Sequence, residues 1–230
     1  MGPNCTRNCR FCNVTSGSVF PLDKDEPANI ARAVKILGLK YVVITSVTRD
    51  DLPDGGAMHF ARVIGAVRDI RPDIKIEVLT PDFKGDIEAL KTVFSAGPDI
   101  FNHNIETVPR LYAQIRPAAD YRRSLAVLRA ASDFGGMAVK SGIMVGLGED
   151  MEELGELFND MQIAGIELLT IGQYLAPSQN HYPVVKYYSP DEFEQLARKA
   201  RQSGIKSVFS GPLIRSSYHA DEQYGAPLTE

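Results

Sequence analysis

Hydrophobic and polar positions along this chain alternate between the period of a helix and that of a buried strand. In segment 27–37, Ile30, Val34 and Leu37 recur on one helical face, and the β-branched run 41–45 follows directly. Similar pairs of segments continue along the chain, each about thirty residues long, as in repeated βα units. The predicted helices span 27–37, 57–70, 87–94, 121–134, 151–164 and 190–202. The predicted strands span 41–45, 75–79, 99–104, 139–145, 168–173 and 206–210.

This alternation predicts an α/β fold, a partial (β/α) barrel whose crossovers all have the same hand. We interpret residues 1–210 as one barrel core and 211–230 as a tail rich in turn residues. In such barrels the chemistry gathers at the C-terminal ends of the strands. Polar clusters stand at those positions, at 45–46, 80, 102–106, 146–149 and 173–174.

The charge and the distribution of apolar residues exclude some classes of binding partner. The 230 residues carry 25 Lys and Arg against 29 Asp and Glu, and the net charge of −4 gives no general attraction to nucleic acid or an anionic membrane. No apolar run is long enough to span a bilayer, and no charged-then-apolar leader opens the sequence. We therefore expect a cytoplasmic protein with neither a nucleic-acid nor a membrane partner.

The three cysteines form one compact array. Cys5, Cys9 and Cys12 have the spacing C-x3-C-x2-C, and their odd number does not suit a secreted disulfide framework. Iron–sulfur clusters ordinarily use four thiolates, so three would leave one iron of a [4Fe–4S] cluster open. An open iron can chelate the amine and carboxylate of S-adenosylmethionine (SAM), and an electron from the cluster would then release a 5′-deoxyadenosyl radical.

Two simpler interpretations compete with a cluster. A tetrahedral zinc site would need a fourth ligand, which one of the four histidines, His59, His103, His181 and His219, could supply. Alternatively, the thiols are inert and unrelated, although nothing then explains their close spacing. The triad favours a cluster over both alternatives.

Several strings of residues resemble a known family. The triad, with Phe11 just before its last cysteine, resembles the radical SAM superfamily motif. The string TSVTRDDLPDGGA at 45–57 resembles the signature of lipoyl synthases. The strings NHNIETV at 102–108, KSGIMVGLGE at 140–149, IGQYL at 171–175 and RSSYHA at 215–220 are similar to the same family.

The resemblance implies a radical SAM sulfurtransferase that inserts two sulfur atoms into an octanoyl chain on a lipoyl carrier protein or domain, forming the lipoyl group. It also implies a reducing partner such as ferredoxin or flavodoxin, a SAM cluster on Cys5, Cys9 and Cys12, and no catalytic residue beyond cluster and SAM. The 46–51 stretch would meet the SAM amine, and Arg116 and Lys140 would bind the SAM carboxylate. Gly142 and Gly146 would let the backbone approach the adenosyl group. The implied cofactor-binding residues are Ser46, Asp50, Asp51, Asn104, Glu106, Arg116, Lys140, Gly142 and Gly146.

Each of these assignments has a simpler alternative. Asp50 and Asp51 could form a solvated turn, and the asparagines could satisfy backbone groups where a strand ends. His103 and His219 could be ordinary hydrogen-bonding residues. The shared motifs favour the functional interpretation for the polar loop residues.

The chain departs from the family near Met1. Lipoyl synthases carry a second trio, C-x4-C-x5-C, upstream of the SAM triad; it binds an auxiliary [4Fe–4S] cluster that Ser217 would complete as an oxygen ligand. This sequence has no such trio, and Met1 to Asn4 are too few for the strand that precedes the triad in the family. We expect a first strand that is missing or incomplete, and a lost N-terminal segment that explains both absences. Such a chain should bind SAM without completing sulfur insertion.

Two alternative functions stay open at this point. One is a catalytically incomplete radical SAM core, and the other is a non-catalytic module that binds lipoyl carriers. Biotin synthase is a chemical rival, but it builds its second cluster from cysteines inside the barrel, where this sequence has none.

Overall fold

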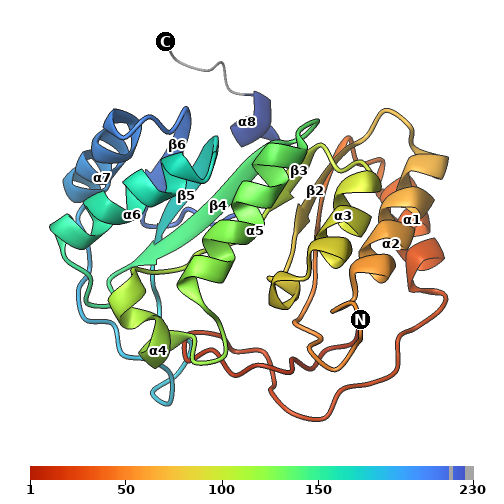
Figure 1. Ribbon diagram of the computed structural model, residues 1–230, viewed down its shortest axis with the longest axis horizontal. Helices are drawn as coiled ribbons and strands as arrows, with labels where there is room; N and C mark the ends of the chain where they lie inside the picture. The colour runs from red at the N-terminus through yellow and green to blue at the C-terminus, as the bar shows by residue number, and fades with distance from the viewer. Residues whose placement is uncertain (218–219, 226–230) are drawn as a thin grey trace.

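A single parallel sheet forms the centre of the molecule. The computed structural model describes residues 1–217 and 220–225, and six strands lie in it in simple sequence order (Figure 1). The strands are β1 (Tyr41–Thr45), β2 (Lys75–Leu79), β3 (Ile100–Asn102), β4 (Ala138–Val145), β5 (Leu168–Gln173) and β6 (Ser207–Gly211). All five neighbouring pairs are parallel, and β1 and β6 are the edge strands of this sheet.

Helices connect successive strands and cover the outer face of the sheet (Figure 1). The longer ones are α1 (Glu26–Leu37), α2 (Ala57–Ile70), α3 (Ile87–Ser95), α5 (Tyr121–Phe134), α6 (Met151–Ile163) and α7 (Pro190–Gln202). Parallel crossovers are right-handed, so strands in sequential order require every helix to lie on the same face. The predicted partial (β/α) barrel is confirmed, with helix and strand ends within two residues of the expected positions.

The core lies between these helices and the sheet. Fully buried Phe101, Leu157 and Phe158 belong to one continuous cluster that extends along the whole barrel wall. The helices present apolar residues to it at the expected 3.6-residue period. Polar side chains cap the N-termini of α3, α5, α6 and α7, and Asp150 and Ser189 form capping boxes at α6 and α7.

Some short elements were not predicted. The chain after β2 forms η1 (Phe83–Gly85), and the chain after β3 forms η2 (Pro109–Leu111) and α4 (Tyr112–Ile115). The tail, expected to consist of turns, contains α8 (Ala220–Gly225), which contacts β1. Elements this short carry no hydrophobic period. The interpretation of 211–230 as a separate tail stays a prediction, as does the expectation that the strand before the triad is missing or incomplete.

β3 is shorter than expected because the chain leaves the ladder after Asn102 and returns at Glu106. There the Glu106 amide donates to the Gly142 carbonyl at 3.0 Å, and the Met144 amide donates to the Glu106 carbonyl at 2.9 Å. Glu106 adopts φ 72°, a left-handed conformation that is uncommon for a residue with a side chain. This bend turns residues 103–105 away from the strand ladder.

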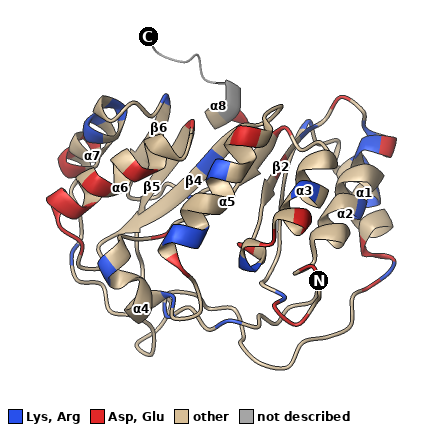
Figure 2. Ribbon diagram, viewed as in Figure 1, with Lys and Arg blue, Asp and Glu red and all other residues tan. Residues whose placement is uncertain are grey.

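Charges of both signs are interspersed over the helices (Figure 2). Within residues 1–217 and 220–225, no helix has the length and apolar character needed to cross a membrane.

Truncating Leu157 to alanine should lower the free energy of unfolding by about 2–5 kcal/mol, because this fully buried side chain leaves a cavity in the core. Ile163→Ala on the same helix, where the side chain is 64% exposed, is the matched control and should change it by about 0.5 kcal/mol or less. Urea denaturation followed by circular dichroism measures both. Equal losses would contradict this account of the core.

Candidate cluster and cofactor site

The three cysteines surround one cavity at the C-terminal ends of the first strands. Cys5, Cys9 and Cys12 are half-buried and line a cavity of about 510 Å³. The opposite wall comes from residues that follow β1, β2 and β3: Ser46, Thr80, Asn104 and Glu106, together with Arg116 after α4. The structure thus brings the triad together with four of the nine residues expected to bind the cofactor.

A buried arginine ties the cysteine loop to the barrel. Arg7, between Cys5 and Cys9, donates to Asp50 through Nε at 2.7 Å and Nη2 at 2.9 Å. It also donates to Asp82 through Nη1 at 3.0 Å and Nη2 at 2.7 Å. Asp50 follows β1 and Asp82 follows β2, so one guanidinium connects the loop to two strand ends. Such paired two-point contacts fix geometry as well as charge. We name this arrangement the Asp50–Arg7–Asp82 bridge.

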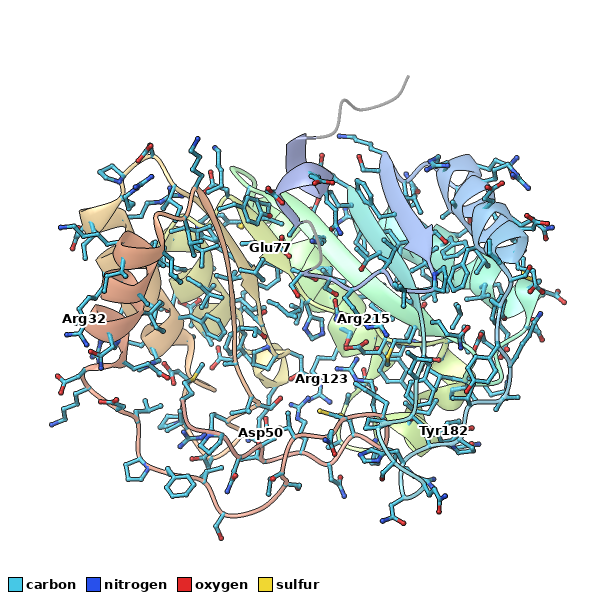
Figure 3. The ribbon with its side chains drawn as sticks, turned by 180° about the vertical axis from the view of Figure 1, so that it is seen from behind. Arg32, Asp50, Glu77, Arg123, Tyr182 and Arg215 are labelled. Atoms are coloured by element: carbon cyan, nitrogen blue, oxygen red, sulfur yellow. The ribbon has the colours of Figure 1, made fainter. Side chains whose placement is uncertain are left out.

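Asp82 is itself held from several sides. It is fully buried, accepts from the Lys84 amide at 3.0 Å, and lies 3.4 Å from Nε of Arg123. Burial opposes its ionisation, but the hydrogen bonds and charge of Arg7 outweigh burial and lower the pKa of Asp82. In Figure 3, Asp50 and Arg123 lie at the same end of the molecule. Neither Arg7 nor Asp82 was singled out from the sequence; the position of Arg7 inside the triad was the available signal.

The 46–51 loop holds the cysteine loop rather than presenting carboxylates to the cavity. Thr48 accepts from the Thr6 amide at 3.1 Å, and the Asp50 amide donates to the Thr6 hydroxyl at 3.0 Å. Asp51 is exposed and pairs with Arg49 at 2.8 Å. Neither Asp50 nor Asp51 is among the residues that line the cavity. The structure therefore places both in ion pairs, while Ser46 lines the cavity, and the expected cofactor contacts of the two aspartates stay predictions.

Two buried polar atoms of the cavity wall have no hydrogen-bond partner among the described residues. They are Oγ1 of Thr80 and Nε of Arg116, on residues that are 5% and 8% exposed. Leaving such groups unpaired is costly, so their presence at a cavity indicates a polar ligand. Nη1 of Arg116 donates to the carbonyls of Asn104 and Ile105 at 3.1 Å each and to the Tyr112 hydroxyl at 3.2 Å. Thr80 was noted in the sequence only as a strand-end polar residue.

Glu106 and Asn104 stand where this cavity meets a second one. The second cavity, of about 200 Å³, shares Phe11, Asn104 and Glu106 with the first. Burial raises the pKa of Glu106, while the charge of Arg116 and a hydrogen bond from Asn104 oppose that rise. Strained backbone of the kind seen at Glu106 is often retained at functional sites.

Three other expected cofactor residues lie elsewhere. Lys140 is buried 3.0 Å from Glu77 and does not line the first cavity, so its expected contact with the SAM carboxylate stays a prediction. Gly142 lines the second cavity. Gly146 has φ 101°, and a β-carbon there would strike Gln173 and the Lys186 carbonyl. Packing of the loop that follows β5 therefore already requires a glycine at this position, and the expected approach to the adenosyl group stays a prediction.

Ser217, the expected ligand of an auxiliary cluster, is exposed just after the last residue that lines the second cavity.

Burial affects the ionisation of two of the three thiols. Burial raises the pKa of the Cys9 and Cys12 thiols, and Arg116 opposes the rise at Cys9. Ligation therefore displaces protons, as is usual for thiolate sites. The histidine that lines this cavity, His103, is engaged through both ring nitrogens, with Thr80 O at 2.9 Å and Ser124 Oγ at 3.1 Å. Its burial lowers its pKa to about 4. As placed, His103 is not the fourth ligand of a zinc site, and His219 lies outside the described residues.

Replacing Asp82 with asparagine should lower the free energy of unfolding by about 3–5 kcal/mol at pH 7, because Arg7 loses a buried partner. The depressed pKa of Asp82 contributes stability that is present above its ordinary pKa of 3.8 and lost as the pH falls further. The difference in the free energy of unfolding between wild type and D82N should thus become smaller below that pH. Urea titrations from pH 7 to pH 3 test this.

The control for D82N is Asp133→Asn, which removes an exposed carboxylate paired with Arg129 and should change stability by about 0.5 kcal/mol or less. A D82N deficit that stays constant down to pH 3 would argue against the ion-pair explanation.

Comparison with solved structures supports the fold. The chain of Streptococcus suis SuiB bound to S-adenosylmethionine superposes with a TM-score of 0.70 at 14% identity, covering 100% of this chain and 51% of that one. HydG, a maturase of the [FeFe]-hydrogenase, gives 0.69 at 18% identity, covering 90% and 49%. This chain spans about half the length of those chains. At such identities the likeness shows the fold alone.

Sequence comparison identifies the family. The model of the radical SAM superfamily matches residues 1–161. The lipoyl synthase of Caldicellulosiruptor saccharolyticus is 53% identical over 223 residues, covering 96% of this chain and 78% of the relative. That of Rubrobacter xylanophilus is 54% identical over 224 residues, covering 97% and 70%. With its three thiols around one cavity of a partial barrel, the chain belongs to the lipoyl synthase family of radical SAM enzymes.

Proposed function

We propose that this protein acts as a lipoyl synthase-type sulfurtransferase through a [4Fe–4S] cluster on Cys5, Cys9 and Cys12. The observation that carries the proposal is the cavity in which three thiols face the unpartnered Thr80 and Arg116. When bound, the cluster and SAM supply a 5′-deoxyadenosyl radical that removes hydrogen from the substrate. The family membership supports an octanoyl chain on a lipoyl carrier as that substrate.

The residues of the chain bind and orient. The three cysteines would hold three irons of the cluster. The Asp50–Arg7–Asp82 bridge fixes the loop between the first two cysteines. Nε of Arg116 and Oγ1 of Thr80 are the free donors for polar groups of SAM. Asn104 and Glu106 are placed between the two cavities, where cofactor and substrate have to meet.

The finer assignments belong to the same proposal. They comprise ferredoxin or flavodoxin as reductant, an auxiliary cluster as the sulfur source, and Ser217 as an oxygen ligand of that cluster. The family motif at 215–217 supports the last point. All three cysteines of the sequence lie in the SAM triad, so any second set of thiolates has to come from outside these 230 residues.

Anaerobic reconstitution with iron and sulfide tests the central claim. The protein should take up about four irons per chain, and SAM with a reductant should then release 5′-deoxyadenosine. Cys9→Ala, which lacks one ligand, should lose the cluster's SAM-dependent spectral change and the product. No 5′-deoxyadenosine from a fully loaded wild-type protein would refute the proposal for this chain.

Thr80→Val should weaken SAM binding by about five- to tenfold, because a hydroxyl that faces the cavity is lost. Folding stability should be kept, since the removed atom is buried and unpartnered in the protein alone. The control is Thr107→Val, which removes another buried, unpartnered hydroxyl away from the cavity. Anaerobic equilibrium dialysis with SAM measures the affinities. Equal affinities in both variants and wild type would exclude Thr80 as a contact.

A further inference from the structure

A row of polar side chains crosses the concave face of the sheet from β1 to β4. Its centre is Glu77 on β2, which is fully buried. Glu77 accepts from the Tyr41 hydroxyl at 2.6 Å, from Nδ2 of Asn102 at 2.9 Å and from Nζ of Lys140 at 3.0 Å. The four residues come from four adjacent strands.

Lys140 reaches beyond this row to the C-terminal tail. Its Nζ donates to the Ser216 carbonyl at 2.7 Å, and the Ser216 hydroxyl donates to Oδ1 of Asn104 at 3.2 Å. The backbone carbonyl and the side chain of Ser216 are therefore bound by β4 and by the segment after β3, respectively. Figure 3 shows Glu77 and Arg215 on the same concave face of the sheet, away from the helices.

Two glycines make room for the tail. A β-carbon at Gly142 would lie 2.7 Å from Oγ1 of Thr170, 2.8 Å from Oδ1 of Asn104 and 2.9 Å from Oγ of Ser216, and one at Gly172 would collide with the Ile214 carbonyl. Neither glycine has a positive φ, so close approach and not backbone conformation accounts for them. Residues 214–216 thus lie directly on β4 and β5, and they complete one wall of the second cavity.

A buried ion pair is an inefficient way to stabilise a barrel. Its desolvation offsets most of the attraction, and apolar side chains of similar size often do as well. Burial lowers the pKa of Lys140, and Glu77 opposes that effect. What an apolar pair could not supply is a charged donor for a carbonyl of the tail. The specific effect of the Glu77–Lys140 ion pair is therefore to hold Ser216 in position.

We propose that the Glu77–Lys140 pair is a tail anchor: it fixes residues 214–216 across Gly142 and Gly172, builds the wall of the second cavity, and so positions Ser217. Lys140 is then a positioning residue rather than a ligand of SAM. The role of Ser217 rests on the proposed function, whereas the anchoring itself is a property of the protein without cofactors.

The test uses the 230-residue chain without cluster or SAM, so its outcome is independent of whether the radical reaction occurs. Trypsin cleaves after arginine, and Arg215 is exposed beside the anchored carbonyl. The double variant Glu77→Gln with Lys140→Met removes the charged donor while keeping the buried charge balanced. Mass spectrometry should show cleavage after Arg215 at a rate on the order of tenfold higher than in wild type, because the local opening of the tail becomes easier.

Gly142→Ala is a second, independent variant. It leaves the ion pair in place but inserts a methyl group against Ser216, and it should accelerate the same cleavage. D82N is the matched control, since it breaks a buried ion pair that does not touch the tail. It should lower global stability without selective cleavage after Arg215.

The anchor is supported if both tail variants are cleaved faster after Arg215 than D82N at equal global stability. It is overturned if the double variant is cleaved at the wild-type rate, or if D82N accelerates this cleavage to the same extent.

Discussion

The connection between the cysteine loop and the strand ends is the constraint on which the site depends. A loop of three cysteines has no regular secondary structure of its own, and without an anchor it would not hold a cavity of fixed shape. Arg7 supplies the anchor by binding Asp50 and Asp82, which lie 43 and 75 residues away along the chain. Both carboxylates follow strands of the sheet, so the loop is bound directly to the rigid part of the barrel.

The interior of this barrel is polar where the outer layer is apolar. Helices and strands share a continuous hydrophobic core on the convex side. On the concave side, Glu77, Asn102 and Lys140 form a hydrogen-bonded row that the tail completes. Glu77 is the acceptor that joins the row, although Oδ1 of Asn102 has no hydrogen-bond partner among the described residues. Thr80 and Arg116 differ from Asn102 in lining the first cavity, so their unpartnered atoms are available to a ligand there.

The architecture followed from the sequence because it depends on local periodicity. Six strands and six helices with distinct periods, in strict alternation, admit few parallel arrangements under the rule of right-handed crossovers. Elements without a period, such as α4 and α8, could not be predicted in that way. The early end of β3 likewise depends on the backbone bend at Glu106, which a strand-like composition does not reveal.

For the site, the sequence by itself predicted three cysteine ligands and indicated the family, because the spacing of Cys5, Cys9 and Cys12 and the long shared strings are local features. Only the tertiary structure decided which polar residues face the cavity. Asp50 and Lys140, both plausible contacts by motif, are engaged by partners 43 and 63 residues away, while Thr80 is left free. The reason is physical: a buried charge binds the nearest compensating group, and the fold alone determines which group that is.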